Sequence, residues 1–418
     1  MQKLVIVGQG YVGLPLSQGA THAGLQVTGL ELNPTTVENL NRGISHVDDI
    51  SDAELSDLIS KGYRASNDPA VISDADVVVI CVPTPLGDAG SPDLGAVIGA
   101  TKTIRDNLSG ETLVILESTT YPGTTEEVCL PILTENGAKL DEDLFLAFSP
   151  ERIDPGNLVY GLKNTPKVVG GISEVSGDRA FAFYSQFIDT VVRAKGAKEA
   201  ETAKLLENTY RHINIALVNE MSKFCNEMDI DLWDVIDAAK TKPFGFQAFY
   251  PGPGVGGHCI PIDPNYLSYS VRKSLGYPFR FVELAEEINN SMPRYVVDRV
   301  QEVLNQSAKA LNGSKVLLLG VTYKQNIADQ RHSPAIPVAE VFLERGADIS
   351  FHDPKIAEWQ VSDQTFTRVE SLDEAIKNAD VVVLLQNHVG YDPDAMAEAS
   401  QAFFDTRGVS TNGNAVRL

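Results

Sequence analysis

One loop combines a cysteine, glycines and an acid at a spacing that suits nucleophilic chemistry. In FYPGPGVGGHCIPIDP, residues 249–264, Cys259 follows Gly256 and Gly257 and precedes Asp263. Glycines let a backbone approach a ligand closely and leave the sulfur accessible. A thiolate adds readily to an aldehyde, and nearby cations lower the pKa of such a thiol. A lone loop cysteine is more often structural. The neighbouring glycines and a dinucleotide site elsewhere in the chain nevertheless favour Cys259 as a nucleophile, with Asp263 placed to orient or deprotonate water.

A second set of polar residues repeats along a predicted helix. Lys204, Asn208 and Arg211 are spaced by four and three residues, so they are predicted to share one face. A lysine and an amide one turn apart can polarise an alcohol oxygen or stabilise an alkoxide as hydride leaves. The alternative is a solvated polar face. A separate apolar stripe recurs at the same spacings: Ala203, Leu206, Tyr210, Ile213, Leu217, Met221 and Phe224.

The N-terminal segment carries a phosphate-binding pattern. GQGYVG at 8–13 fits G-x-G-x-x-G and stands between a predicted strand, KLVIV at 3–7, and a predicted helix over 11–22. Glu31 ends the next predicted strand, where a carboxylate accepts hydrogen bonds from a ribose diol and repels a 2′-phosphate. NAD is therefore the expected cofactor, and a glycine-rich turn without a ligand is the alternative. The predicted contacts are Gly8, Gly10, Tyr11, Val12, Gly13 and Glu31.

Three further loops follow predicted strands of the same domain, where doubly wound sheets bind ligands. CVPTP at 81–85 supplies Thr84, and ESTTYPGT at 117–124 supplies Thr119. SPER at 149–152 supplies Glu151, which can polarise a water, and Arg152, which can pair with phosphate or carboxylate. Ordinary turn residues and a surface ion pair are the alternatives.

The order of apolar segments predicts an α/β protein with two Rossmann-like doubly wound domains. Strand–helix alternation fills residues 1–195, the NAD-binding domain. A helical middle domain with a long central helix, which can also carry a dimer interface, is expected over 196–305. Alternation resumes over 306–418, where KVLLLG at 315–320 and NADVVVLL at 378–385 echo KLVIVG at 3–8 and DADVVVIC at 74–81. This second copy lacks the glycine triplet, so we expect it to bind a nucleotide by other contacts.

Bulk composition narrows the classes of partner. The 418 residues carry a formal net charge of −22, which argues against binding nucleic acid or anionic membranes. Apolar runs are too short to span a membrane and the N-terminus lacks a leader pattern, so a cytoplasmic protein is expected. Cys81 and Cys225 are expected to be packing residues, Cys129 is expected to lie in a helix, and the cysteine spacings suggest neither a metal site nor disulfides.

These motifs together resemble the nucleotide-sugar dehydrogenases, the family of UDP-glucose and UDP-N-acetylhexosamine 6-dehydrogenases. The resemblance covers nearly the whole chain and rests on GQGYVGLP, SPER, LLENTYRHINIALVNE, GGHCIPIDP and GVTYKQNIADQRHSP. FYPGPG and RFVELAEEIN are most similar to the branch acting on UDP-N-acetylglucosamine or its epimers. Ile262 and Pro155 stand where many UDP-glucose enzymes carry lysine and a second glutamate, which also favours the N-acetylhexosamine branch over the UDP-glucose enzymes.

The resemblance implies a role for each matching residue. Thr84 and Thr119 join the NAD site, Cys259 forms a thioester, and Lys204 and Asn208 hold the reacting oxygen. Asp263, Thr119 and Glu151 are linked to water and proton handling. The implied contacts to the nucleotide sugar are Glu151, Arg152, Lys204, Asn208, Arg211, Tyr250, Gly256, Lys324 and Arg331.

The predicted function is an NAD-dependent four-electron oxidation of C6 of a UDP-N-acetylhexosamine, with UDP-N-acetylglucosamine favoured, by a homodimer or higher homo-oligomer. UDP-glucose and UDP-N-acetylmannosamine are the alternative substrates. A hydroxyacid or sugar-acid dehydrogenase, which consumes one NAD⁺ and needs no cysteine, is a rival enzyme class. A nucleotide-binding protein that has lost catalysis is the non-enzyme alternative.

Overall fold

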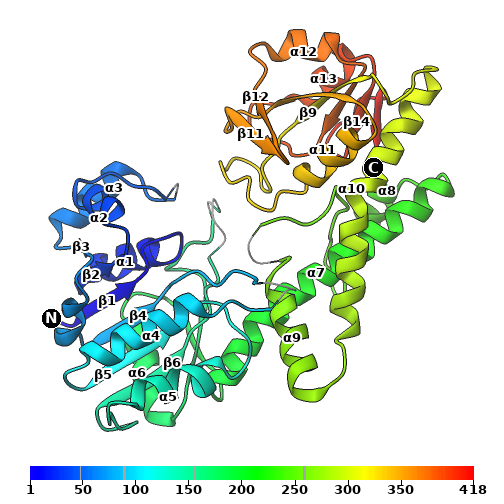
Figure 1. Ribbon diagram of the computed structural model, residues 1–418. Coiled ribbons are helices and arrows are strands. Elements are labelled where there is room, and N and C mark those ends of the chain that lie inside the picture. Colours follow the sequence, from blue (N-terminus) through cyan, green and yellow to red (C-terminus); the bar gives the residue numbers. More distant parts are fainter. Residues whose placement is uncertain (48, 88–90, 154–156, 158, 258–259) are drawn as a thin grey trace. The chain divides into compact units, whose positions relative to one another are not determined.

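The computed structural model describes residues 1–47, 49–87, 91–153, 157, 159–257 and 260–418, which form two compact units (Figure 1). The N-terminal unit comprises Met1–Glu207 and Asn265–Tyr277, and the C-terminal unit comprises Asn208–Pro264 and Pro278–Leu418. Two helices supply residues to both units, α7 (Ala197–Glu227) and α9 (Asp263–Leu275). The three domain boundaries given above stay predictions. Two residues singled out above, Cys259 and Pro155, lie outside the described residues.

The N-terminal unit is built on one eight-stranded sheet of order β3-β2-β1-β4-β5-β6-β7-β8. All neighbours are parallel except β6 and β7. The strands are β1 (Lys3–Val7), β2 (Gln26–Leu30), β3 (Arg64–Ser66), β4 (Val77–Ile80), β5 (Thr112–Leu116), β6 (Leu144–Phe148), β7 (Lys167–Gly171) and β8 (Val191–Arg193). Its helices are α1 (Gly13–His22), α2 (Pro34–Asn41), α3 (Asp52–Ser60), η1 (Pro69–Asp74), α4 (Gly95–Asn107), η3 (Thr125–Cys129), α5 (Leu130–Thr134) and α6 (Glu174–Tyr184).

Both faces of this sheet are covered, and its central strands β4 and β6 consist of apolar residues that are buried at every position. In β1, Leu4 and Ile6 join a core cluster with residues of α1 and α6, whereas Val5 and Val7 join a second cluster with residues of α4. Strand order reverses between β1 and β4, which places a ligand crevice at their carboxyl ends. The predicted doubly wound sheet is confirmed, Cys81 is buried in its core as expected, and Cys129 is also buried there.

The C-terminal unit carries a second, entirely parallel sheet of order β10-β9-β13-β14-β15. Its strands are β9 (Lys315–Leu319), β10 (Asp348–His352), β13 (Val381–Leu384), β14 (Phe403–Asp405) and β15 (Ala415–Arg417). A hairpin of β11 (Glu358–Val361) and β12 (Gln364–Thr367) was not anticipated. The helices are α8 (Leu232–Ala239), α10 (Arg280–Gln306), α11 (Ala335–Glu344), α12 (Leu372–Asn378) and α13 (Pro393–Ala399). The predicted second Rossmann-like sheet is therefore present.

Helix α7 buries its polar side and exposes much of its apolar stripe. Lys204 and Asn208 are only 8% and 5% exposed, whereas Arg211 on the same helix is exposed. Leu206, Leu217 and Phe224 of the stripe are 64%, 54% and 45% exposed. The solvated polar face considered above is thus wrong for Lys204 and Asn208. A helix with this inverted burial needs polar partners on one side and a further apolar surface on the other.

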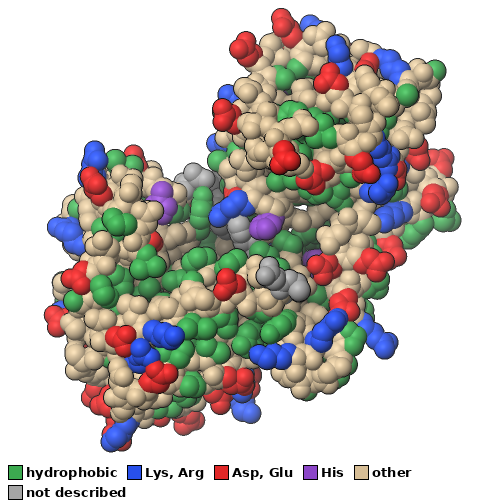
Figure 2. All heavy atoms as spheres, in the orientation of Figure 1, with side chains coloured by type: hydrophobic (Ala, Val, Ile, Leu, Met, Phe, Trp, Pro, Cys, Tyr) green, Lys and Arg blue, Asp and Glu red, His purple; other side chains and the backbone are tan. Residues whose placement is uncertain are grey.

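The surface agrees with the composition. Acidic and basic side chains are interspersed over the visible face of each unit in Figure 2. Among the described residues, every helix is too short or too polar to cross a bilayer.

Candidate active site

The three glycines of the first turn differ in what an added Cβ atom would contact. Gly8 has φ +91°, and a Cβ there would lie 2.7 Å from the Cys81 carbonyl oxygen. A Cβ on Gly13 would lie 1.9 Å from the Gly8 oxygen, so close helix–strand packing excludes it. A Cβ on Gly10 would meet nothing within 4 Å. Gly10 therefore borders open space at the N-terminus of α1, where backbone and helix dipole favour a pyrophosphate.

Glu31 directly follows β2 and is fixed by backbone amides on either side. Its Oε2 accepts a hydrogen bond from Gln9 N at 3.2 Å, and its Oε1 accepts one from Asn33 N at 3.1 Å. Asn33 in turn caps α2 through Thr35 N at 2.9 Å. Each carboxylate oxygen retains a lone pair, so Glu31 can still accept from a ribose diol. This open cradle beside a held carboxylate fits the adenosine half of NAD.

Gln9, inside the glycine motif, is a supporting residue that sequence reasoning missed. It is fully buried, and its Nε2 donates to Ile6 O at 2.9 Å. Its Oε1 accepts from Ser17 Oγ at 3.1 Å and Tyr63 OH at 2.8 Å. These bonds pin the turn from beneath. Gln9 occupies a position of the G-x-G-x-x-G motif that can hold any residue, so the sequence alone does not indicate its supporting role.

The loops after β4 and β5 lie at the carboxyl edge of the same sheet. The Thr84 carbonyl accepts a hydrogen bond from Tyr266 OH of α9. Ser118 Oγ donates to Val82 O at 2.7 Å, which joins the two loops. Thr119 is only partly buried, as is Val12, while Tyr11 is 36% exposed. Roles for these side chains in cofactor binding stay predictions.

Lys204 is held by the loop that follows β6. Its Nζ donates to the Glu151 carbonyl oxygen at 2.6 Å, 53 residues away in sequence. The neighbouring Arg152 is engaged by Glu207, with Nε 3.0 Å from Oε1, and its Nη1 donates to Pro166 O at 2.8 Å. The structure thus brings Lys204 and Glu151 together. Arg152 has a structural partner in addition to any substrate contact.

Asn208 and Asp263 form a buried pair in the C-terminal unit. Asn208 Nδ2 donates to Asp263 Oδ2 at 2.5 Å, and Asp263 is only 2% exposed. The amide orients the carboxylate, which is the first residue of α9. These are two of the residues that sequence spacing selected, and the sequence gap of 55 between them shows that the fold joins independent motifs.

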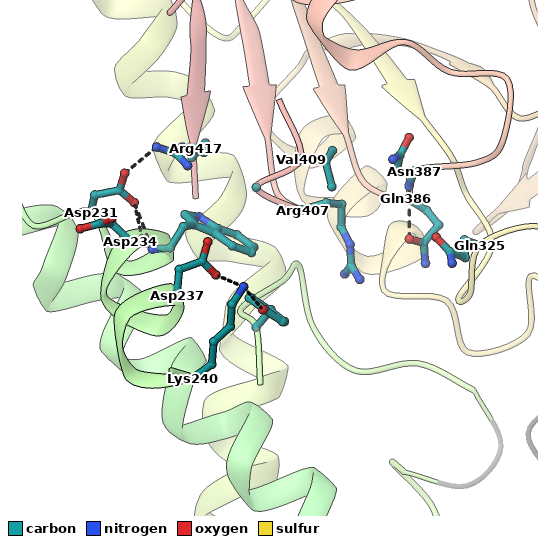
Figure 3. A pocket seen from close by; sticks show the side chains of 13 residues that line it. Asp231, Asp234, Asp237, Lys240, Gln325, Gln386, Asn387, Arg407, Val409 and Arg417 are labelled. Atoms are coloured by element: carbon teal, nitrogen blue, oxygen red, sulfur yellow. Dashed lines mark hydrogen bonds and ion pairs between the residues drawn. The ribbon is translucent and has the colours of Figure 1, made fainter. Parts of the chain in front are cut away.

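The C-terminal sheet has its own ligand crevice at the reversal of strand order between β9 and β13. Gly320 has φ +75°, and its Cβ would lie 2.1 Å from the Gln386 oxygen, which parallels Gly8 against Cys81. A cavity of about 550 Å³ opens at this edge. Figure 3 shows side chains of α8 facing residues at the strand ends across it. Its lining includes Trp233, Lys240, Tyr250, Gln325, Gln386, Asn387, Arg407 and Arg417.

Arg407 is the cation of this cavity that sequence reasoning missed. Lys240 and Arg417 pair with Asp237 and Asp231 at 2.6 and 2.5 Å, whereas Arg407 pairs with no residue that the structure describes. Its loop is shaped by Asp405, whose two oxygens accept four backbone N–H groups of residues 407–410 at 2.7–2.9 Å. Arg407 could have been found from the sequence by its position just after β14, since ligands bind at the ends of parallel strands.

Predicted substrate residues of this unit line the same region to different degrees. Tyr250 stacks on Trp233, with ring centroids 5.7 Å apart, and borders the cavity. A Cβ on Gly256 would lie 2.9 Å from Tyr323 Cβ, so Gly256 packs against the 320–334 segment. Arg331 Nη2 lies 2.7 Å from Asp329 Oδ2 and is thereby held within its own loop. Lys324 follows Tyr323 in that segment, which Gln386 Nε2 anchors through Tyr323 O at 3.2 Å.

A glycine cradle beside a held carboxylate, a second crevice at strand ends and a buried lysine on a long helix are the arrangement expected of a dinucleotide-dependent oxidoreductase. Models of the UDP-glucose/GDP-mannose dehydrogenase family match the chain in succession: the NAD binding domain over residues 2–188, the central domain over 198–291 and the UDP binding domain over 317–412. The chain belongs to this family. It is an NAD-dependent nucleotide-sugar dehydrogenase, as the motifs indicated.

Named relatives cover most of the chain. A UDP-N-acetyl-D-mannosamine dehydrogenase of Methanocaldococcus jannaschii is 33% identical over 395 residues, which is 93% of this chain and 86% of that protein. A UDP-N-acetyl-D-glucosamine 6-dehydrogenase of Pseudomonas aeruginosa is 34% identical over 359 residues, or 85% and 83%. The solved structure of a UDP-D-ManNAc dehydrogenase from Pyrococcus horikoshii has a TM-score of 0.90 at 27% identity, covering 100% of this chain and 98% of that one.

Proposed function

We propose that the protein oxidises the C6 hydroxyl of a UDP-N-acetylhexosamine to a carboxylate, using two NAD⁺. The observation that carries the proposal is the buried Lys204, whose ammonium is fixed on the Glu151 carbonyl at 2.6 Å. An ammonium costs several kcal/mol to bury, so its retention on the inner side of α7 argues for a chemical task. Asn208, one turn further along, is likewise buried and oriented.

Bound NAD⁺ supplies the hydride acceptor, and the chain supplies position and charge. Lys204 and Asn208 donate to the C6 oxygen and stabilise the charge that develops as its proton leaves. The Cys259 thiolate, proposed from sequence, adds to the resulting aldehyde and keeps its carbon in place for the second oxidation. The thioester so formed is hydrolysed by a water that Asp263 orients, releasing the carboxylate and restoring the thiol.

The uridine diphosphate is proposed to occupy the cavity of the C-terminal unit. Arg407 supplies a cation for phosphate that forms no ion pair within the described part of the chain, and Tyr250 supplies an aromatic face to the same cavity. Lys324 lies in the adjoining segment, as the family resemblance implies. The net charge of −22 makes such local cations necessary for an anionic substrate.

The sugar is proposed to be an N-acetylhexosamine. Ile262 and Pro155 favour this class over UDP-glucose, and the family resemblance favours UDP-N-acetylglucosamine. The relatives above are named for both the mannosamine and the glucosamine substrate, so UDP-N-acetylmannosamine is the second candidate.

The test is NADH release over UDP-glucose, UDP-N-acetylglucosamine, UDP-N-acetylgalactosamine and UDP-N-acetylmannosamine, with the product identified by mass. Two NADH for each uronate are expected, with an N-acetylated sugar preferred. One NADH per product would support the hydroxyacid-type rival, and tight binding without turnover would support the non-enzyme alternative. Cys259→Ser is expected to abolish uronate while NAD⁺ binding persists. Lys204→Ala should lower kcat far more than it raises KM.

We further propose that the exposed stripe of α7 joins two copies in a homodimer. Tyr210, Leu217 and Phe224 of α7, with Met228 just after its end, are large apolar side chains that are exposed to solvent in one copy of the chain. Leu217→Glu is expected to yield a monomer by light scattering. Val175→Glu, which changes an exposed apolar residue of α6 and not of α7, should leave the oligomer intact. A Leu217→Glu protein that stays dimeric would exclude this interface.

A further inference from the structure

The N-terminal unit buries a charged cluster that the proposed chemistry does not use. Lys167, the first residue of β7, is only 4% exposed. Its Nζ lies 3.0 Å from Glu117 Oε1 and 3.7 Å from Glu151 Oε2. One buried ammonium is therefore the shared counter-charge of two carboxylates, one just beyond β5 and the other just beyond β6.

The surroundings show how much this arrangement depends on Lys167. Tyr184 OH donates to Glu117 Oε1, and the Lys167 ammonium lies 5.0 Å above the Tyr184 ring. Glu117 Oε2 and Glu151 Oε2 are buried without a hydrogen-bond partner among the described residues. Burial raises the pKa of Glu117 despite the nearby ammonium. Burial lowers the pKa of Lys167, but Glu117 and Glu151 outweigh it and raise that pKa overall.

The cluster lies directly behind the loop that holds Lys204. The loop is joined to β7 on both sides of Lys167, since Ser149 Oγ donates to Val168 O at 2.8 Å and Arg152 Nη1 donates to Pro166 O at 2.8 Å. Glu151 uses Oε1 for its own loop, accepting Arg152 N at 2.6 Å, and turns Oε2 towards Lys167. Its carbonyl is then left facing the Lys204 ammonium.

We propose that Lys167 is a positioning residue: it ties the Glu117 and Glu151 carboxylates together and so holds the 149–153 loop in the conformation that fixes Lys204. The inference rests on the proposed function, in which Lys204 stabilises the reacting oxygen. Without the ammonium, two buried carboxylates must take up protons or water. The loop then relaxes, and a displacement of about 1 Å at a catalytic group lowers a rate by about 100-fold.

The experiment compares Lys167→Met, Lys167→Arg and Lys198→Met. Lys198 is the matched control, because it also pairs with two glutamates, at 3.0 and 3.1 Å, but on the surface. Lys167→Met is expected to lower kcat by about 100-fold with KM for NAD⁺ changed less than about threefold. Lys167→Arg should recover at least a tenth of the activity, and Lys198→Met should match wild type.

A second variant covers the case in which Lys167→Met does not fold. Lys167→Met/Glu117→Gln removes both members of the closest ion pair, which is much less disruptive than removing one. The same loss of kcat is expected in a protein with a wild-type circular dichroism spectrum. An unchanged kcat in either folded variant would reduce Lys167 to a stability contact and overturn the proposal.

A measurement without turnover separates this inference from the proposed function. Competitive acetylation of Lys204 across pH, followed by peptide mass analysis, should show slow labelling in wild type and Lys198→Met, and about tenfold faster labelling once Lys167 is replaced. If no UDP-sugar is oxidised but labelling changes as stated, positioning stands while the proposed function fails. Identical labelling in all variants would refute positioning whatever the activity.

Discussion

Gly10 and Gly13 differ in what an added methyl group would meet, and this difference separates cofactor binding from folding. At Gly10 a Cβ meets nothing within 4 Å, so the chain itself tolerates alanine. At Gly13 a Cβ would lie 1.9 Å from the Gly8 carbonyl oxygen, a backbone atom in a turn that cannot move aside. Gly10→Ala should therefore fold normally and bind NAD⁺ poorly, whereas Gly13→Ala should destabilise the N-terminal unit.

The expected sizes follow from these contacts. Gly10→Ala restricts the unfolded chain and should raise the free energy of unfolding by about 0.4–1 kcal/mol or leave it unchanged. Its methyl group fills the space beside the pyrophosphate, and overpacking costs about 1–3 kcal/mol, which is about a 5- to 150-fold weaker Kd for NAD⁺. Gly13→Ala meets backbone, so a loss of stability of about 3 kcal/mol or more is expected.

Urea unfolding by circular dichroism and NAD⁺ titration by calorimetry give both quantities. Gly99→Ala is the control, because Gly99 lies exposed within α4 and its Cβ would also meet nothing within 4 Å. Gly99→Ala should raise the free energy of unfolding by about 0.5–1 kcal/mol through its higher helix propensity, and the variant should bind NAD⁺ as wild type does. Wild-type NAD⁺ affinity in a folded Gly10→Ala protein would show that the pyrophosphate does not pass this turn, and would refute the assignment of the cradle.

Three further changes test the two nucleotide sites and one buried histidine. Glu31→Ala should weaken NAD⁺ binding about tenfold and reduce the preference for NAD⁺ over NADP⁺, as measured by titration with each cofactor. An unchanged ratio of the two Kd values would contradict recognition of the ribose by Glu31. Arg407→Met should weaken UDP binding about 10- to 150-fold by calorimetry while NAD⁺ affinity stays, and equal losses of both would indicate a folding defect. Burial lowers the pKa of His212 to about 4 from its usual 6.5, so between these values the unfolded chain binds a proton that the folded chain does not, and stability falls as pH falls from 6.5 to 4. This contribution reaches about 3 kcal/mol, and the difference between wild type and His212→Gln in urea midpoints over pH 4–7 should reveal it; parallel curves would contradict it.

The sequence predicted the parts of the site whose cause is local. A strand of consecutive apolar residues followed by GQGYVG has few alternatives, and Glu31 follows from the position of the next strand end. Lys204 and Asn208 were selected by helical spacing, which sequence alone supplies. Glu151 and Asp263 were also candidates, but their pairing with Lys204 and Asn208 was not predicted, because they are 53 and 55 residues away and only the tertiary fold brings them near. For the same reason the sequence did not predict the pairing of Lys167 with Glu117, or the Asp405 turn that presents Arg407.

The inverted burial of α7 explains why its chemistry and its packing are inseparable. Several buried polar groups on the helix reach other segments: Glu201 accepts from Gly123 N and Thr125 N beyond β5, at 2.5 and 2.9 Å, and Asn219 accepts from Gly252 N at 2.9 Å. Lys204 and Asn208, between them in sequence, reach the Glu151 loop and the start of α9. Hydrogen bonds are directional, so such contacts fix where a loop lies more sharply than apolar contacts do. A helix that devotes its inner side to positioning loops has its apolar residues left for the outer side, which is the surface that the proposed homodimer would bury.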